Sequence, residues 1–151
     1  MSFLTLTLLG AAEAAMIIFT GLRLMGAGVP LRLLVIMGLA CSLGIRVIRY
    51  FLYVIVGAPF GVHVVVAVFM YFGVIRRYFR VSEFVAAGAV LVSFLILIIG
   101  TGLVLMVYAN GGPAFQAPAV LLAVENLPLA TATVIIWKRG LCLIPPGLRS
   151  E

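Results

Sequence analysis

The chain has 151 residues, of which 66% are hydrophobic and only 9% are charged, with a formal net charge of +6. A soluble domain typically carries about 25% charged residues, and a chain this small has too much surface to bury two thirds of its side chains. The composition therefore excludes a water-soluble globular fold and predicts an all-α helix bundle that spans a lipid bilayer. The basic residues flank apolar runs, so we expect lipid headgroups as their partners and no nucleic acid.

Five apolar runs have the length of about 20 residues that a helix needs to cross a hydrocarbon core. In chain order they cover residues 3–23, 31–55, 60–79, 83–109 and 115–137, and Gly- or Pro-containing or polar segments separate them. The sequence predicts one transmembrane helical domain over residues 1–139 and a short cytoplasmic tail over 140–151.

The basic residues alternate along these runs and predict the orientation. The second and fourth connections carry no charge, whereas the first connection, the third connection and the C-terminal flank are basic. Short loops rich in Lys and Arg stay in the cytoplasm, so we expect the N-terminus outside and the C-terminus inside, in a bacterial cytoplasmic (inner) membrane. We define the basic collar, which fixes topology or holds anionic lipid, as Arg76, Arg77, Arg80, Lys138 and Arg139.

Several ionisable residues fall inside the apolar runs. Glu13 and Glu125 lie near the middle of the first and fifth runs, where an unpaired charge costs at least ~2.5–3.5 kcal/mol. Arg46 and Arg49 share one face of the second run at similar depths. The sequence predicts an outer-facing polar cluster of Glu13, Arg46, Arg49, His63, Glu125 and Asn126. In the alternative interpretation, the arginines extend to headgroups and the glutamates are neutral packing residues.

Two further features concern helix shape and packing. Pro128 removes a backbone donor inside the fifth run and predicts a helix kink beside Glu125 and Asn126, which is either a site-shaping hinge or an ordinary tolerated kink. Small residues recur along the fourth run and predict close helix packing or, alternatively, a homo-oligomer interface: Ala86, Ala89, Ser93 and Gly100.

The sequence contains no constellation typical of an enzyme. We find no nucleophile paired with a base and no phosphate-binding glycine loop, so we expect a non-enzymatic protein without a cofactor. Cys41 falls inside a predicted helix and Cys142 in the predicted tail, and His63 has no second metal-ligating neighbour in the sequence, so we expect no metal site.

The order of these parts resembles a known family. The stretch Pro59–His63 opens the third run, the basic stretch Ile75–Arg80 closes it, and Leu127 and Pro128 precede Lys138 in the last run. This pattern resembles the five-span membrane sensor region of Gram-positive, peptide-sensing histidine kinases of the accessory-gene-regulator type. The residues printed after Arg139 are too few for the kinase domains that follow in that family, so we expect the sensor region without them. The resemblance implies a sensor module whose signal passes to a separate membrane protein partner.

Three functions remain open at this stage. The first is a receptor or regulatory module that binds a ligand or partner protein through the polar cluster. The second is a small transporter or channel subunit in which Glu13 and Glu125 handle protons or ions. The third is a structural subunit of a membrane assembly. A hydrated path through the bundle favours the second, a pocket closed on its inner side favours the first, and dry packing favours the third.

Overall fold

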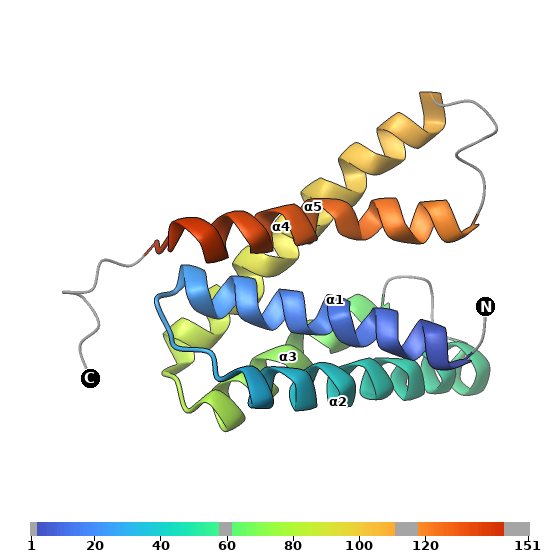
Figure 1. Cartoon of the computed structure of the whole chain (residues 1–151). Coiled ribbons are helices and arrows are strands. Elements are labelled where there is room, and N and C mark those ends of the chain that lie inside the picture. The colour runs from blue at the N-terminus through green and yellow to red at the C-terminus, as the bar shows by residue number, and fades with distance from the viewer. Residues whose placement is uncertain (1–2, 58–61, 111–117, 144–151) are drawn as a thin grey trace.

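A computed structural model describes residues 3–57, 62–110 and 118–143, without the side chains of residues 3, 105, 107–110 and 118–125. This part of the chain is all-helical (Figure 1). The elements are α1 (Phe3–Leu24), α2 (Leu31–Tyr50), the π-helical turn η1 (Phe51–Val56), α3 (Val62–Phe79), α4 (Glu83–Asn110) and α5 (Pro118–Arg139). The predicted runs overlap these helices, with ends that differ by three residues or fewer. Most of the second connection, the fourth connection and the end of the predicted tail lie outside the described residues.

Four helices of the described chain are long and apolar enough to cross a membrane. They are Leu4–Leu24, Leu31–Val56, Val62–Phe79 and Glu83–Val104. The second of these joins α2 and η1, which follow one another without a break. Several apolar helices of this length are compatible with a multi-pass membrane protein.

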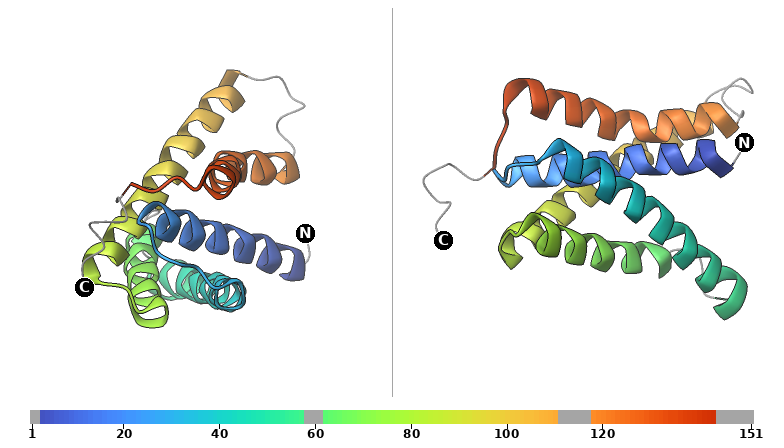
Figure 2. Two further views of the ribbon diagram at one scale, coloured as in Figure 1. Left: turned by 60° about the vertical axis from the view of Figure 1, so that its left-hand side comes forward. Right: turned by 60° about the horizontal axis from the view of Figure 1, so that its bottom comes forward.

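The helices form a ring of four with the fifth outside it. Contacts join α1 to α2, α2 to α3, α3 to α4 and α4 back to α1, whereas α5 packs on α1 and α4. Figure 2 shows α5 on the side of the bundle remote from α3 in both views. The space inside the ring is therefore lined by α1, α2, α3 and α4 alone among the described helices.

Small residues allow the helix backbones of the ring to approach one another. A Cβ atom at Gly21 of α1 would overlap the backbone carbonyl oxygen of Ala89 of α4, and one at Gly38 of α2 would lie 2.7 Å from the carbonyl oxygen of Ala11 of α1. The hydroxyl of Ser93 donates a hydrogen bond of 2.8 Å to the carbonyl oxygen of Ile17. The small residues of α4 thus pack inside this chain, as the close-packing interpretation predicts.

The end of α5 is tied to the end of α1. Gly140 has a φ of 61°, a left-handed conformation that glycine adopts readily, and its N–H bonds the carbonyl oxygen of Ile136 at 2.9 Å. The chain then turns back, and the N–H of Leu143 donates a hydrogen bond of 2.6 Å to the carbonyl oxygen of Leu24. The last turns of α1 and α5 therefore share one end of the bundle.

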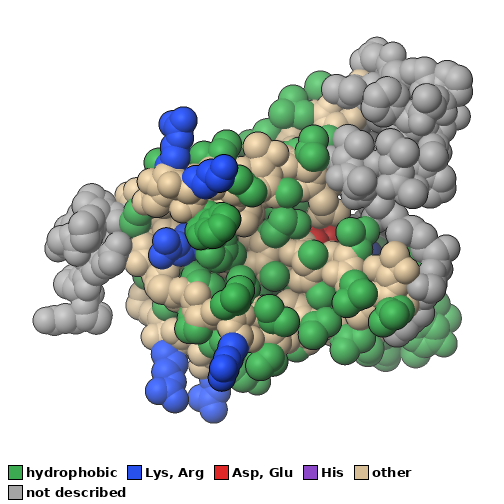
Figure 3. All heavy atoms as spheres, viewed as in Figure 1, with side chains coloured by type: hydrophobic (Ala, Val, Ile, Leu, Met, Phe, Trp, Pro, Cys, Tyr) green, Lys and Arg blue, Asp and Glu red, His purple; other side chains and the backbone are tan. Residues whose placement is uncertain are grey.

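Basic side chains gather at that same end. The last turns of α1, α3 and α5 carry Arg23, the pair Arg76 and Arg77, and the pair Lys138 and Arg139. Figure 3 shows Lys and Arg side chains concentrated at the end of the molecule where these helices finish, with hydrophobic side chains covering the flank. We call this the basic end.

The close-packed core lies in the half of the bundle next to the basic end. Most of its fully buried side chains come from the second half of α1, the second half of α3 and the first half of α4, among them Ile18, Leu22, Tyr71, Ile75, Ala89 and Val90, and α5 adds Leu129. The other half contains fewer buried apolar residues, and it is there that the ring encloses a cavity.

Candidate functional site

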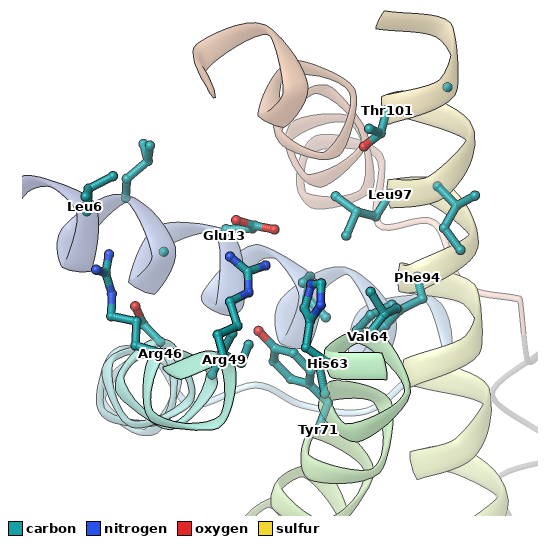
Figure 4. A pocket seen from close by; sticks show the side chains of 18 residues that line it. Leu6, Glu13, Arg46, Arg49, His63, Val64, Tyr71, Phe94, Leu97 and Thr101 are labelled. Carbon is teal, nitrogen blue, oxygen red and sulfur yellow. The ribbon is translucent and has the colours of Figure 1, made fainter. Parts of the chain in front are cut away.

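A cavity of about 820 Å³ lies inside the ring, between α1, α2, α3 and α4 (Figure 4). Its volume falls within the roughly 300–1,000 Å³ typical of small-molecule sites. Each of these four helices lines it mainly with residues from the part that lies away from the basic end, for example Glu13 in α1, Arg46 in α2, His63 in α3 and Thr101 in α4.

Four of the six residues predicted for the polar cluster line this one cavity: Glu13, Arg46, Arg49 and His63. The two arginines share a face of α2 because they are three residues apart, close to one helical turn. Figure 4 shows the guanidinium of Arg49 directed toward the carboxylate of Glu13, and the imidazole of His63 pointing into the same space from α3. Opposite charges at this depth reduce the cost of keeping both ionised.

The π-helical turn η1 supplies a residue that the sequence analysis did not select. Tyr53 of η1 shares a hydrogen bond with Nδ1 of His63, and the two rings make an edge-to-face contact with centroids 5.5 Å apart. Such turns often occur at functional sites. A π turn rotates the residues that follow it relative to an α-helix. The apolar pattern of the segment therefore does not predict the direction in which Tyr53 points.

The cavity is closed on the side toward the basic end. Tyr71 of α3 is 2% exposed and meets Phe94 of α4 edge to face, with ring centroids 5.7 Å apart. Beyond this pair, Leu22, Ile75 and Val90 are at most 2% exposed. Tight apolar packing therefore forms the floor of the cavity.

The wall contributed by α4 differs from the walls contributed by α1 and α2. Phe94, Leu97 and Ile98 present apolar surface, and the hydroxyl of Thr101 is the polar side-chain group among the α4 lining residues. Gly102 also lines the cavity, and a Cβ atom there would meet nothing within 4 Å. The site thus combines a charged side with an apolar side.

The remaining predicted site residues lie elsewhere. The side chain of Glu125 is outside the described residues, so its predicted meeting with the arginines stays a prediction. Asn126 of α5 is partly buried but is not a lining residue of the cavity. Pro128 lies inside α5, and a Cβ atom at Gly100 of α4 would lie 2.5 Å from its ring, so it packs against α4 at a glycine.

The basic collar lies at the basic end, away from the cavity. Arg76 forms an ion pair of 2.5 Å with Glu83, which joins the end of α3 to the start of α4. Both side chains are more than half exposed, so the pair contributes ~0–1 kcal/mol at most. Arg80, between these helices, adopts a left-handed backbone conformation with φ of 53°.

The cavity has the chemistry of a binding site. Within the part of the chain that the structure describes, no group of three or more His, Cys, Asp or Glu side chains is placed to hold a metal ion. Two guanidinium groups, a carboxylate and an imidazole can orient a polar group, while the apolar side can hold a hydrocarbon body. Comparison of the chain with models of protein families, with curated proteins and with solved structures found no match.

Proposed function

We propose that this protein is a membrane receptor or regulatory module that binds a ligand in the cavity enclosed by α1, α2, α3 and α4, reached from the outer side of the membrane. The observation that carries this proposal is the combination of charged and apolar walls with a floor closed by Tyr71 and Phe94. A transport path needs continuous polar lining through the bundle, whereas tight apolar packing lies beyond the floor.

The proposal includes five spans, with the N-terminus outside and the C-terminus in the cytoplasm of a bacterial inner membrane. Two observations support it. With 22 residues, α5 is about 33 Å long, which is enough to cross a hydrocarbon core of about 30 Å. The basic residues in the last turns of α1, α3 and α5 gather at one end of the bundle, as the positive-inside rule requires of the cytoplasmic side.

The partner of such a module is a second membrane protein. The resemblance to membrane sensor regions supports this part of the proposal, and the exposed basic collar offers a cytoplasmic contact surface. Binding in the cavity would then change how the basic end contacts that partner. A signal of this kind requires that the ligand bind two arrangements of the helices with different affinity.

The experiment is a side-resolved labelling of the cavity. We expect a thiol introduced by Thr101→Cys, in a Cys41→Ala background, to react with a small membrane-impermeant thiosulfonate added on one side of the membrane only. That side is opposite to the one from which the native, exposed Cys142 reacts. Comparison with Cys142 makes the result independent of absolute orientation.

Leu103→Cys is the matched control, because Leu103 lies two residues further along α4, is 60% exposed and does not line the cavity. A lipid-facing thiol at this depth should not react. Reaction of Thr101→Cys from both sides would instead favour a transporter or channel, and reaction from neither side would favour a structural subunit.

A further inference from the structure

One face of α4 lines the cavity, and its exposure rises along the helix. The lining residues recur at spacings of three or four and so share one side of α4: Phe94, Leu97, Ile98, Thr101 and Gly102. Phe94 is 9% exposed, whereas Ile98 is 61% exposed. Leu95 is a neighbour of Ile98 on the helix surface and is also exposed, but it does not line the cavity. The cavity face of α4 therefore continues into its lipid-facing side at Ile98.

This border lies on the side of α4 that faces α3. On its other side α4 is closed against α1, where the hydroxyl of Ser93 bonds the backbone of Ile17. Val64 of α3 also lines the cavity and is 37% exposed. The two helices touch at the floor of the cavity, and Figure 1 and Figure 2 both show them diverging from there, away from the basic end. The cavity is therefore open sideways between Val64 and Ile98.

The side opening lies at the depth of hydrocarbon. Val64 lies about 22 Å along α3 from Phe79, and Ile98 lies about 22 Å along α4 from Glu83. Both starting points adjoin the basic end, where the ion pair of Arg76 joins the two helices. A hydrocarbon core is about 30 Å thick, so in the proposed orientation the opening meets the acyl chains of the outer leaflet. A hydrated molecule would lose its water on this route, whereas an aliphatic chain would not.

The interior continues the apolar route. Figure 4 shows Phe94 and Leu97 directed into the cavity from α4, with the polar side chains of Glu13, Arg49 and His63 on the side of α1, α2 and α3. A chain that lies along α4 is covered by apolar groups. A polar group attached to that chain is within the same cavity as hydrogen-bonding side chains, which is the usual composition of a small-molecule site.

We infer that the ligand is an acyl-chain lipid of the outer leaflet, which enters sideways between α3 and α4 and lays its chain along α4. Both the ligand class and the route rest on the proposed function. The source of the ligand is the bilayer and not the aqueous phase. Occupancy of the cavity therefore follows the lipid composition of the outer leaflet.

The probe is phosphatidylcholine with bromine atoms on its acyl chains, which quench tryptophan fluorescence at close approach. The full chain carries Phe94→Trp and Trp137→Phe, because Trp137 is the single native tryptophan. Since Phe94 is 9% exposed and lies at the floor, strong quenching there requires a chain inside the cavity. In brominated nanodiscs we expect a loss of fluorescence close to that of Leu95→Trp, the lipid-facing neighbour. Quenching of Leu95→Trp alone would overturn the inference.

Blocking the opening tests the route. Gly102→Phe places a ring where a Cβ atom meets nothing, and it should remove the quenching of Phe94→Trp. The matched control is Gly73→Phe, at a helical glycine that also has open space but does not line the cavity, and it should leave the quenching unchanged. Equal quenching with both substitutions would contradict entry between α3 and α4. If Phe94→Trp does not fold, Leu97→Trp repeats the measurement higher in the cavity.

The thiol labelling separates failure of this inference from failure of the proposed function. If Thr101→Cys reacts from the outer side only and Phe94→Trp is not quenched, the ligand comes from water, so the inference is wrong and the proposed function stands. Reaction of Thr101→Cys from both sides or from neither side contradicts the proposed function, whatever the fluorescence shows.

Discussion

At the scale of single residues, Gly21 decides how near α1 comes to α4. Its hydrogen atom occupies the position where any Cβ would overlap the carbonyl oxygen of Ala89 and come within 2.6 Å of the hydroxyl oxygen of Ser93. The contact to Ala89 is with backbone, which cannot rotate away as a flexible side chain can. The hydrogen bond from Ser93 to Ile17 depends on the same close approach.

We therefore predict that Gly21→Ala destabilises the bundle by about 1–3 kcal/mol, the usual cost of overpacking a close contact. Thermal unfolding in a mild detergent measures the change. Gly73→Ala is the control, because a Cβ atom at Gly73 meets nothing and alanine is the better helix former, so this variant should be as stable as the parent or slightly more stable. Equal stability of the two variants would show that α1 and α4 separate at little cost.

At the scale of the elements, α5 is attached to the ring by polar as well as apolar contacts. The hydroxyl of Thr133 donates to the carbonyl oxygen of Leu129 one turn earlier at 2.7 Å, and its oxygen lies 2.8 Å from the hydroxyl oxygen of Thr20 on α1. A hydroxyl has one proton to donate, so Thr20 donates to Thr133. Thr20 is fully buried and Thr133 is partly buried, so the Thr20 side of this bond is shielded from water and lipid.

A double-mutant cycle of Thr20→Val, Thr133→Val and the pair should give a coupling free energy of about 0.6 kcal/mol, and no more than ~1.7 kcal/mol, as for other hydrogen bonds between membrane helices. Valine keeps the shape of threonine and removes the hydroxyl. Additive single effects would mean that the two hydroxyls stabilise their own helices independently and do not attach α5 to α1. Unfolding free energies in lipid or detergent supply the four corners of the cycle.

At the scale of the whole molecule, the basic collar lies at one end, and the cavity with Arg46 and Arg49 lies in the other half. We predict that native Cys142, exposed beyond α5, reacts with an impermeant thiol reagent only from the cytoplasmic side. Val56→Cys, at the end of η1 in the opposite half, should react only from outside. Right-side-out and inside-out vesicles provide the two measurements, and the reverse pattern would invert the proposed orientation.

The helical architecture could be predicted because the pattern that indicates each helix lies within one continuous segment of the sequence. Long apolar runs separated by turn residues or by the basic stretch Arg76–Arg80 require no knowledge of neighbours, and the described chain is helical in each run. The depth of a residue in a membrane also follows from its position along a helix. This is why Glu13, Arg46 and Arg49 could be expected at similar levels, and the structure places them on one cavity.

The depth of a residue in the membrane does not predict how its helix is rotated about its own axis. Asn126 was expected beside the arginines, but α5 packs outside the ring, where it does not line the cavity. Tyr53, Tyr71 and Thr101 were not selected for the site, because an aromatic or hydroxyl residue in an apolar run is usually a packing residue. Their roles depend on the π turn and on the ring arrangement, which are set by contacts between distant segments.

The hydrogen bond between Leu143 and Leu24 mechanically connects the segment after α5 to the end of α1. The same helix carries the Glu13 carboxylate at the cavity, and it ends about 16 Å further on at Leu24. Tight packing around Leu22 holds α1 against the core near that end. A shift of Glu13 would therefore reach Leu143 only together with the buried residues of α1 between them, among them Ile17, Ile18 and Gly21.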